Sequence, residues 1–349
     1  MAFRAAQNKW AIILDTGQYA KFAFNLSFKG KQEETMKFII PGLFAAGLMF
    51  SAHADSHMEN TETDWTKSRF GEEDRLGAMN NLSEEKTLAA SKLIKTGKTY
   101  PLAVVTGRDS QTIEPREYDV LIVQLSDGSG TPLGENKATG NDDLVNTFVG
   151  IGSQIDGLGH MGSDHHYYNG VHVSEFVTTG GLTQFGTQDL PPIATRGILL
   201  DMTKQFGHPV PDGTPFNKAE IDKALEDAGL TLEKGDVVLF HTGKMSASEG
   251  EEFAQTEPGL GVEGAQYLAD SGVVAVGADT WALEAIPFEN MARPFDVHVT
   301  LLAKNGVYIL ENMVTEDLAA DGATEFFFTL GVPRLDGTVQ AIINPVAIR

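Results

Sequence analysis

Three residues that can bind metal ions or move protons lie at the end of one predicted strand. Gln154, Asp156 and His160 follow an apolar segment that begins at Phe148. Side chains two apart in a strand point to the same face, and the glycines before His160 allow the chain to fold back. An amide oxygen, a carboxylate and an imidazole suit Mn or Zn. The segment therefore predicts a metal site, and a hydrogen-bonded Asp with a surface His beside a turn is the alternative.

A second pair of such residues lies far downstream. His298 is embedded in the apolar segment Phe295–Leu302, and Glu311 follows the predicted strand Val307–Leu310. A carboxylate at the end of a buried strand requires a partner, because buried charges are paired or coordinated. The pair is therefore expected to be paired or coordinated within a functional site. The alternative is a hydrogen-bonded core histidine and an ordinary strand-end charge.

Other residues are candidates for a substrate pocket. Trp281 is suited to line the pocket of an aromatic substrate, with simple core packing as the alternative. His241 ends a predicted strand, where loops often carry function. His165 and His166 are further candidates, and for these two and for His241 a solvated or structural role is the alternative. The remaining histidines in polar loops are predicted to be surface residues: His57, His172 and His208.

Composition excludes several classes of protein. The sequence has no cysteine, which excludes disulfides, thiolate nucleophiles and cysteine-bound zinc. The formal net charge is −22, and 20 basic and 45 acidic residues remain when residues 1–54 are set aside. Such acidity argues against nucleic acids and anionic membranes as partners, since both are polyanions. We expect a small-molecule substrate.

The N-terminal region is predicted to be removed before the protein folds. Met36 and Lys37 precede a short apolar segment that ends at Ala52-His53-Ala54, a pattern typical of a secretory signal peptide. We therefore interpret residues 1–35 as an over-extended start, 36–54 as the signal peptide, 55–75 as a flexible lead-in and 76–349 as the folded domain. This organisation predicts a periplasmic or secreted protein. No later segment is apolar over the roughly 20 residues of a membrane anchor.

The domain alternates between strand and helix patterns. Near-continuous apolar segments predict strands buried on both faces, with helices covering a central sheet. We expect one domain of α/β or α+β class with a mixed sheet. Strands are expected at Tyr118–Leu125, Phe148–Ile155, Gly197–Met202, Asp236–His241, Val273–Ala278, Val307–Leu310, Phe326–Val332 and Thr338–Ile343. Helices are expected at residues 83–97, 217–229, 262–270 and 295–303.

Taken in order along the chain, these motifs resemble the metal-dependent cyclase family, which contains bacterial kynurenine formamidases and isatin hydrolases. The resemblance rests on Q-x-D-x-x-x-H, the distal His298, and Glu311-Asn312. Further similar segments are Tyr167–Gly170, Gly235–Leu239 with Thr242-Gly243, Gly277–Thr280 with Glu284, and Ile343–Pro345. The resemblance covers residues 75–349 and implies a swivelling β/β/α fold and a homo-oligomer, a dimer or tetramer.

Matched to the family motif H-x-x-x-H-x-D-x-x-x-H, Asp156 is a metal ligand and His160 the catalytic histidine. His298 and Glu311 match the distal ligands. The first two histidines of the motif fall on Gly150 and Gln154. Glycine cannot coordinate, and an amide offers only a neutral oxygen. The resemblance therefore implies one Mn or Zn ion held by Asp156, His298 and Glu311, with Gln154 or His160 assisting.

The resemblance also implies an activity. It predicts hydrolysis of a small amide, formamide, lactam or lactone by metal-activated water, with His160 as the general acid and base. N-formylkynurenine, an intermediate of tryptophan breakdown to kynurenine, is the leading candidate substrate. Export favours a scavenging or detoxifying hydrolase as a competing role. The alternative from another class is a catalytically impaired protein that binds a metal or small ligand on the same fold.

Overall fold

The computed structural model describes residues 65–110, 113, 115–124, 131–248 and 253–349. All of them belong to one compact unit, Asn60–Arg349. The predicted extended start, the signal peptide and the first part of the lead-in lie outside the described residues. Residues 65–75, the end of the expected lead-in, contact the domain: the hydroxyls of Ser68 and Tyr168 lie 2.6 Å apart.

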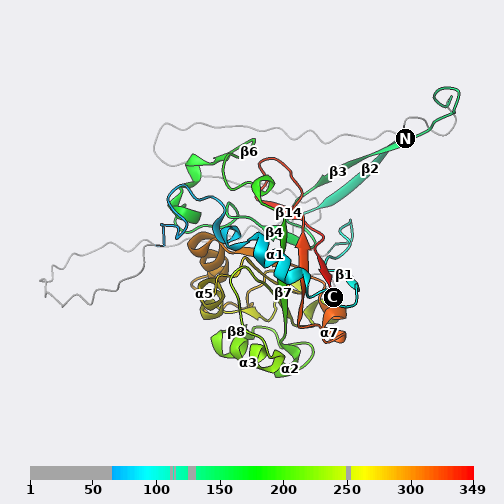
Figure 1. Cartoon of the computed structure of the whole chain (residues 1–349). Coiled ribbons are helices and arrows are strands. Elements are labelled where there is room, and N and C mark those ends of the chain that lie inside the picture. Colours follow the sequence, from blue (N-terminus) through cyan, green and yellow to red (C-terminus); the bar gives the residue numbers. More distant parts are fainter. Residues whose placement is uncertain (1–64, 111–112, 114, 125–130, 249–252) are drawn as a thin grey trace, which may run out of the picture. The chain divides into compact units, whose positions relative to one another are not determined.

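A nine-stranded mixed sheet forms the centre of this unit (Figure 1). The strands β7, β9, β11 and β12 run parallel to one another, and the flanking strands pair antiparallel. This arrangement confirms the predicted mixed sheet. In spatial order, the strands are β1 (Thr99–Pro101), β15 (Val346–Ile348), β13 (Glu325–Leu330), β7 (Ile193–Asp201), β9 (Val237–His241), β11 (Ala275–Ala278), β12 (Tyr308–Glu311), β4 (Gln154–Asp156) and β14 (Gln340–Ile342).

Short strand pairs and helices complete the fold. The smaller pairs are β2 (Tyr118–Gln124) with β3 (Asn141–Thr147), β5 (Val177–Thr178) with β6 (Gly181–Leu182), and β8 (Pro215–Phe216) with β10 (Gly259–Leu260). The α-helices are α1 (Glu84–Ser91), α2 (Thr203–Phe206), α3 (Lys218–Ala228), α4 (Lys244–Ala247), α5 (Val262–Asp270), α6 (Asp296–His298) and α7 (Glu316–Ala320). The other helical turns are η1 (Gly77–Asn81), η2 (Tyr168–Gly170), η3 (Val173–Glu175), η4 (Thr187–Asp189) and the π-helical η6 (Val299–Lys304).

The parallel strands are apolar because helices cover them. Every residue of β9 and β11 is buried, and α1, α3 and α7 pack against β7. The predicted helix at residues 217–229 is confirmed as α3. Its first turn is closed by Glu220, whose carboxylate accepts the Asn217 N–H at 2.9 Å, and Gly229 ends it with a left-handed φ of 67°. Among the described residues, no helix has the length and apolarity needed to cross a bilayer.

Two predicted elements differ from the structure: the first helix in its length and buried face, and the strand Phe148–Ile155 in its length. Helix α1 ends at Ser91 rather than near Gly97, and its Leu88 is exposed, so the expected apolar stripe does not face the core. The predicted strand Phe148–Ile155 is only the short β4; the preceding residues 148–153 form bends. Glycines at 150 and 152 interrupt that segment, and the φ of Gly152 is +65°, which a regular strand does not adopt.

The β2–β3 hairpin corrects a third expectation. Tyr118–Leu125 was expected to be a strand buried on both faces, but β2 pairs with β3 alone. Its apolar side chains Leu121, Ile122 and Val123 are exposed. Apolar composition therefore does not by itself distinguish a central strand from one that lacks a covering layer.

Candidate active site

Three neighbouring strands place four polar side chains on one face of the sheet. In the antiparallel β12–β4 pair, Glu311 lies opposite Gln154 and Ile309 opposite Asp156. Positions two apart share a face, so Gln154, Asp156 and Glu311 converge. Gln340 of β14 pairs with Asp156 from the other side. All four side chains are buried: Gln154, Asp156, Glu311 and Gln340.

His298 completes this cluster from the helical segment α6–η6. Its Nε2 lies 3.2 Å from Oε1 of Glu311 and 3.8 Å from Oδ2 of Asp156. Its Nδ1 is hydrogen-bonded to Oε1 of Glu284 at 2.5 Å. A carboxylate behind an imidazole fixes the ring and makes the other nitrogen a stronger ligand. His298 and Glu311, which the sequence predicts to form a pair, therefore lie in direct contact.

The geometry of the cluster fits a single divalent ion. The ligand atoms of Asp156, His298 and Glu311 all lie within 4.8 Å of one another. Oδ2 of Asp156 is buried and has no hydrogen-bond donor. A buried carboxylate oxygen without a donor is costly unless a cation satisfies it. The residues present therefore match the donor set of two carboxylates and one imidazole that Zn or Mn accepts.

Burial and crowding shift the pKa values in the cluster. Burial, together with the negative charge of Asp156, raises the pKa of Glu311 to about 7. Burial alone would lower the pKa of His298, but its hydrogen bonds to Glu284 and Glu311 outweigh that effect and raise the pKa to about 10. Both pKa values are therefore raised well above their ordinary values, and shifts of this size are typical of functional sites, where charged groups share a small buried volume.

Amide groups occupy the space where the resemblance implies two histidines. Gln154 donates from Nε2 to Oε2 of Glu311 at 2.6 Å and to Oδ1 of Asp156 at 3.1 Å. Gln340 donates to the same Oδ1 at 2.7 Å. A Cβ on Gly150 would lie 2.4 Å from the Gln340 amide oxygen. In this arrangement Gln154 offers its N–H rather than the oxygen that we expected to bind metal.

His160 lies at the edge of the cluster. Its Nε2 is 3.9 Å from Oδ2 of Asp156, and its ring centre is 6.4 Å from that of His298. Burial lowers the pKa of His160, and the charge of Asp156 only partly opposes that effect. The imidazole is therefore neutral near pH 7 and free to accept a proton from a group in the site.

Backbone strain surrounds the cluster. Three non-glycine residues adjacent to it have left-handed φ values: Leu283 at 62°, Phe295 at 57° and Asn312 at 55°. Leu283 precedes Glu284, and Asn312 follows Glu311. Strained backbone of this kind persists where the surrounding structure holds a functional arrangement in place.

Trp281 lies beside the cluster as a pocket residue. It lines a crevice together with Arg116, Gly150, Gln154 and Asn312. The backbone N–H groups of Trp281 and Ala282 donate to the buried Glu257 carboxylate at 2.7 and 2.8 Å, which fixes this loop. A neighbouring pocket of about 210 Å³ shares Gly152 and Asn312 with the crevice.

The structure separates His241 from this group and adds residues that sequence reasoning missed. His241 lies in another cluster, with His208 and Glu316. Glu284 and Gln340 were not predicted as site residues. Glu284, a charge inside the apolar Ala282–Ala285 segment, gave a signal of the same kind as Glu311. Gln340 gave none, because strands commonly contain single polar residues.

Comparison with known proteins gives the family. The family model described as "Putative cyclase" matches residues 94–285, more than half of the chain. The protein therefore belongs to the cyclase family. A kynurenine formamidase of Bacillus cereus is 31% identical over 117 residues, which are 33% of this chain and 52% of that protein. One of Bacillus thuringiensis is 29% identical over 133 residues, 38% of this chain and 57% of that protein. The match thus spans about half the length of these relatives.

Solved structures agree with the fold. A crystal structure described as a novel cyclase has a TM-score of 0.73 and 27% identity, and the match covers 80% of this chain and 96% of the other. Isatin hydrolase A from Ralstonia solanacearum has a TM-score of 0.56 and 14% identity, covering 77% of this chain and 98% of the other. The second likeness supports the fold alone.

Proposed function

We propose that this protein is a metal-dependent hydrolase of a small amide, formamide, lactam or lactone. The proposal rests on one observation: the Oδ2 atom of Asp156 is buried without a donor and faces His298 and His160 at 3.8 and 3.9 Å. Acidic oxygens and an imidazole gather there, and among the described residues no lysine or arginine donates a hydrogen bond to Asp156. A cation from outside the chain completes such a cluster.

Asp156, His298 and Glu311 would hold the ion, and Glu284 would keep the His298 ring in place. A bound divalent ion polarises a carbonyl group and lowers the pKa of water from about 16 to about 7. The buried setting strengthens these electrostatic effects, because little water screens them. Gln154 and Gln340 restrain the carboxylates through the hydrogen bonds that they donate.

His160 is proposed to carry the proton. It is neutral near pH 7 because burial lowers its pKa, so it can take a proton from the attacking water and return it to the leaving amine. The Nε2 atom of His160 lies 3.9 Å from Oδ2 of Asp156, which is beyond hydrogen-bonding distance, so it can take part in that transfer.

An aromatic formamide of the N-formylkynurenine type is the leading substrate candidate. Support comes from Trp281, which lines the crevice beside Gln154, and from the formamidase relatives, although these match over only part of their length. An indole ring suits an aromatic substrate through stacking. Lactams and lactones carry the same kind of reactive carbonyl group, so the assay must include each class.

The test uses the protein with Mn or Zn added after removal of metal by a chelator. We expect turnover of at least one member of a panel of aromatic formamides, lactams and lactones. His160→Ala is expected to lower turnover about 10²- to 10⁴-fold while metal stays bound. Half-buried His172, which lies outside the cluster, provides the matched control His172→Gln. Unchanged turnover in His160→Ala would defeat the proton-carrier role.

A second candidate function is a binding protein without catalysis. The observation that favours it is the filling of two motif positions: Gln340 occupies the space above Gly150, and Gln154 hydrogen-bonds both carboxylates. Fewer imidazole ligands weaken metal binding and its chemistry. Stoichiometric metal with no turnover of any substrate in the panel would support this candidate over the hydrolase.

Export and oligomerisation stay part of the proposal. The signal pattern at residues 36–54 supports a periplasmic or secreted protein, and N-terminal sequencing of the protein from a periplasmic fraction tests it.

The exposed apolar β2–β3 hairpin supports a homo-oligomer, because a two-stranded ribbon is marginally stable alone and a second copy can cover it. Light scattering with Leu121→Lys, expected to weaken association, tests that part.

A further inference from the structure

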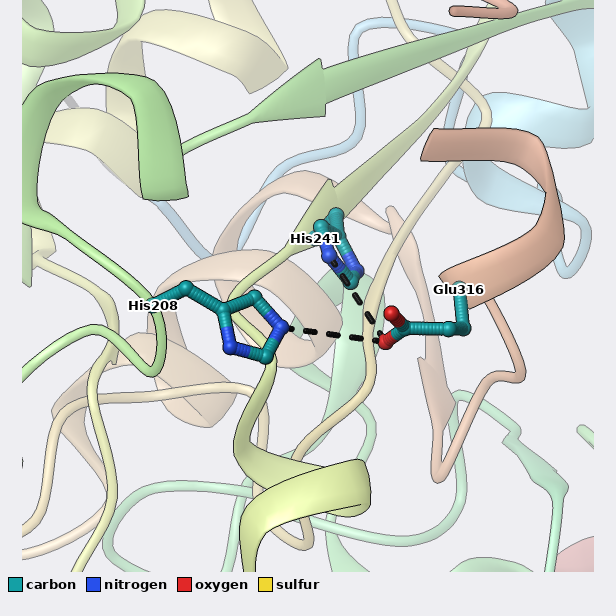
Figure 2. Close-up of side chains that lie close together, drawn as sticks. All are labelled: His208, His241 and Glu316. Atoms are coloured by element: carbon teal, nitrogen blue, oxygen red, sulfur yellow. Dashed lines mark ion pairs between the residues drawn. The ribbon is translucent and has the colours of Figure 1, made fainter. Parts of the chain in front are cut away.

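A second group of histidine and carboxylate side chains lies outside the candidate active site. His208 follows helix α2, His241 is the last residue of β9, and Glu316 is the first residue of α7. Figure 2 shows the three side chains pointing toward one another from these separate segments. Three distant parts of the chain thus bring two imidazoles and one carboxylate together.

The distances in this group suit a shared ion better than direct contacts. Nε2 of His208 and Nε2 of His241 each lie 3.9 Å from the same oxygen, Oε2 of Glu316. That separation is beyond a hydrogen bond. A tetrahedral ion with bonds of about 2.0–2.1 Å holds its ligand atoms about 3.4 Å apart. A shift of about half an ångström closes the gap, and half-exposed His208 and Glu316 have the freedom to make it.

His241 is held as a metal-binding histidine usually is. Its Nδ1 lies 2.8 Å from the Thr315 hydroxyl and 3.4 Å from Oδ2 of Asp279. Asp279 is fixed in turn by the backbone N–H groups of Thr242 and Gly243, at 2.8 and 2.9 Å. A carboxylate behind the ring orients the imidazole and leaves its other nitrogen for the ion.

The local charge favours a cation. Asp201 lies beside His241 in the β7–β9 register and is also 3.5 Å from the exposed Lys204 ammonium. With Asp279 and Glu316, three carboxylates therefore surround the two imidazoles. Lys244, the nearest lysine along the chain from His241, is engaged by Asp212 at 2.9 Å. The half-exposed positions of His208 and Glu316 also give an ion access from solvent, which the buried Asp156 cluster does not offer as directly.

The sheet separates this group from the Asp156 cluster. Leu239, Gly277 and Leu310 lie side by side in β9, β11 and β12. His241 is two residues beyond Leu239 and keeps its face, whereas Glu311 is one residue beyond Leu310 and points to the opposite face. The two groups therefore cannot share one ion.

We propose that His208, His241 and Glu316 form a second metal site, for a divalent ion of the zinc type. Two imidazoles and one carboxylate leave a fourth position open to solvent, a ligand set that zinc accepts. An ion there ties the segment after α2 and the start of α7 to the end of the central strand β9. The site does not depend on hydrolase activity at Asp156.

The experiment measures Zn²⁺ binding in competition with a coloured chelator, using the full chain with Asp156→Asn to disable the first cluster. We expect one Zn²⁺ to remain bound. Adding His208→Gln or Glu316→Gln should weaken that binding by at least about 100-fold, since even outer-shell changes cost 10- to 100-fold. Both residues are half-exposed, so neither variant removes core packing. His172→Gln, at a half-buried histidine elsewhere, is the matched control and should leave the affinity unchanged.

Equal Zn²⁺ affinity with and without His208→Gln and Glu316→Gln would overturn the proposal. Loss of the ion in the control variant alone would do the same, because it would assign the ion to the His165–His172 region. Turnover is not the readout, so absence of hydrolysis leaves this test intact. If the proposed hydrolase function is wrong but the second site is real, the protein will be inactive towards the substrates, and His208→Gln will still weaken Zn²⁺ binding.

Discussion

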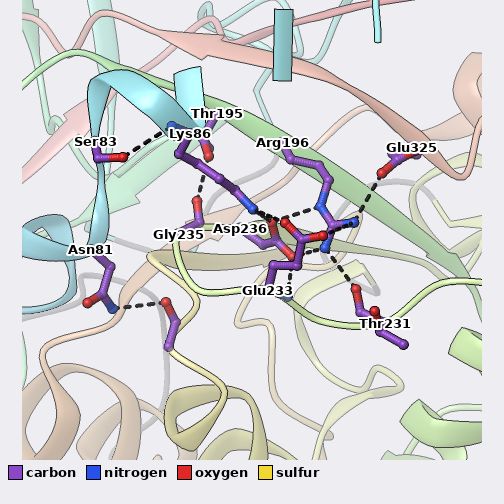
Figure 3. A network of polar contacts seen from close by, with 11 residues as sticks. Asn81, Ser83, Lys86, Thr195, Arg196, Thr231, Glu233, Gly235, Asp236 and Glu325 are labelled. Carbon is purple, nitrogen blue, oxygen red and sulfur yellow. Dashed lines mark hydrogen bonds and ion pairs between the residues drawn. The ribbon is translucent and has the colours of Figure 1, made fainter. Parts of the chain in front are cut away.

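Asp156 and Asp236 are both fully buried carboxylates at strands of the same sheet, yet their surroundings differ in one respect. Asp236 receives hydrogen bonds from Arg196 at 2.9 and 2.6 Å and lies 2.7 Å from the Lys86 ammonium (Figure 3). The Glu233 backbone N–H donates a further hydrogen bond at 2.8 Å. Asp156 receives only two amide N–H groups, both on Oδ1, and its Oδ2 has none.

This comparison distinguishes a buried charge that stabilises the fold from a buried charge that belongs to a ligand site. Around Asp236 the chain supplies its own cations, so the carboxylate is neutralised within the fold and joins β7 to the start of β9. Around Asp156 further acidic groups gather, and the positive charge of Arg116 acts on Glu311 without neutralising the cluster. The remaining balancing charge comes from protonation of His298 or from a bound ion. A buried acid without a matching base therefore indicates a ligand site, whereas one with a bidentate arginine indicates architecture.

The largest expected effect comes from removing the charge of Asp236. Asp236→Asn leaves Arg196 and Lys86 nearly buried without their partner, and this should lower the free energy of unfolding by about 3–5 kcal/mol. Asp156→Asn in metal-free protein should leave that free energy unchanged or raise it, because one of two crowded negative charges is removed. Urea unfolding in the presence of a chelator measures both. An equally destabilised Asp156→Asn would show that Asp156 is a structural residue.

Metal binding should restore the balance at Asp156. With free Mn²⁺ or Zn²⁺ at 100 times its dissociation constant, one site adds about 2.7 kcal/mol to the free energy of unfolding. We expect this gain in His208→Gln protein, where only the first cluster binds, and expect it to vanish when Asp156→Asn is added. Thermal unfolding with increasing metal measures it. A gain that survives Asp156→Asn would remove Asp156 from the ligand set.

The pH dependence should distinguish the two regions further. The pKa of His298, raised to about 10 by Glu284 and Glu311 despite burial, lies above its ordinary 6.5. The protonated ring therefore stabilises the metal-free fold fully below about pH 6.5, and that contribution is lost as pH rises toward 10. Metal displaces this proton, so Mn²⁺ affinity should rise about tenfold per pH unit, or 1.4 kcal/mol, from pH 7 upward.

Calorimetry in two buffers of different ionisation enthalpy checks this by counting released protons. We expect about one proton released near pH 8, and more near pH 6, because the pKa of Glu311 is raised to about 7 by burial and by Asp156. An affinity that does not change between pH 7 and pH 8.5 would contradict the assignment of His298 as a ligand.

The smallest effect is expected at the rim of the Asp236 network. The Glu233 carboxylate contacts Lys86 at 2.8 Å and Arg196 at 3.3 Å, but its side chain is 56% exposed. Solvent screens such pairs, so Glu233→Gln should change the free energy of unfolding by less than about 1 kcal/mol. A loss as large as that of Asp236→Asn would mean that the network acts as one unit rather than through its buried pair.

Sequence patterns predicted the parallel centre of the fold better than its periphery. The segments that became β9, β11, β12 and α5 were identified because burial on both faces demands apolar residues, and helical spacing marks α5. The β2–β3 hairpin and the short β4 were misjudged. Apolar composition in Tyr118–Gln124 carries no information on whether another layer covers it, and two glycines disrupted the strand before Gln154.

The sequence by itself determined the chemistry of the candidate site. Asp156, His160 and Glu311 were identified by residue type and by their place at or just after strand ends, and His298 as a histidine within an apolar segment. Only the tertiary structure decided which groups meet. The antiparallel register of β4 with β12 brings Gln154 opposite Glu311, β14 adds Gln340, and the parallel register of β9 turns His241 away toward His208 and Glu316. Pairing between strands that are distant in the sequence sets these contacts, and no local pattern records it.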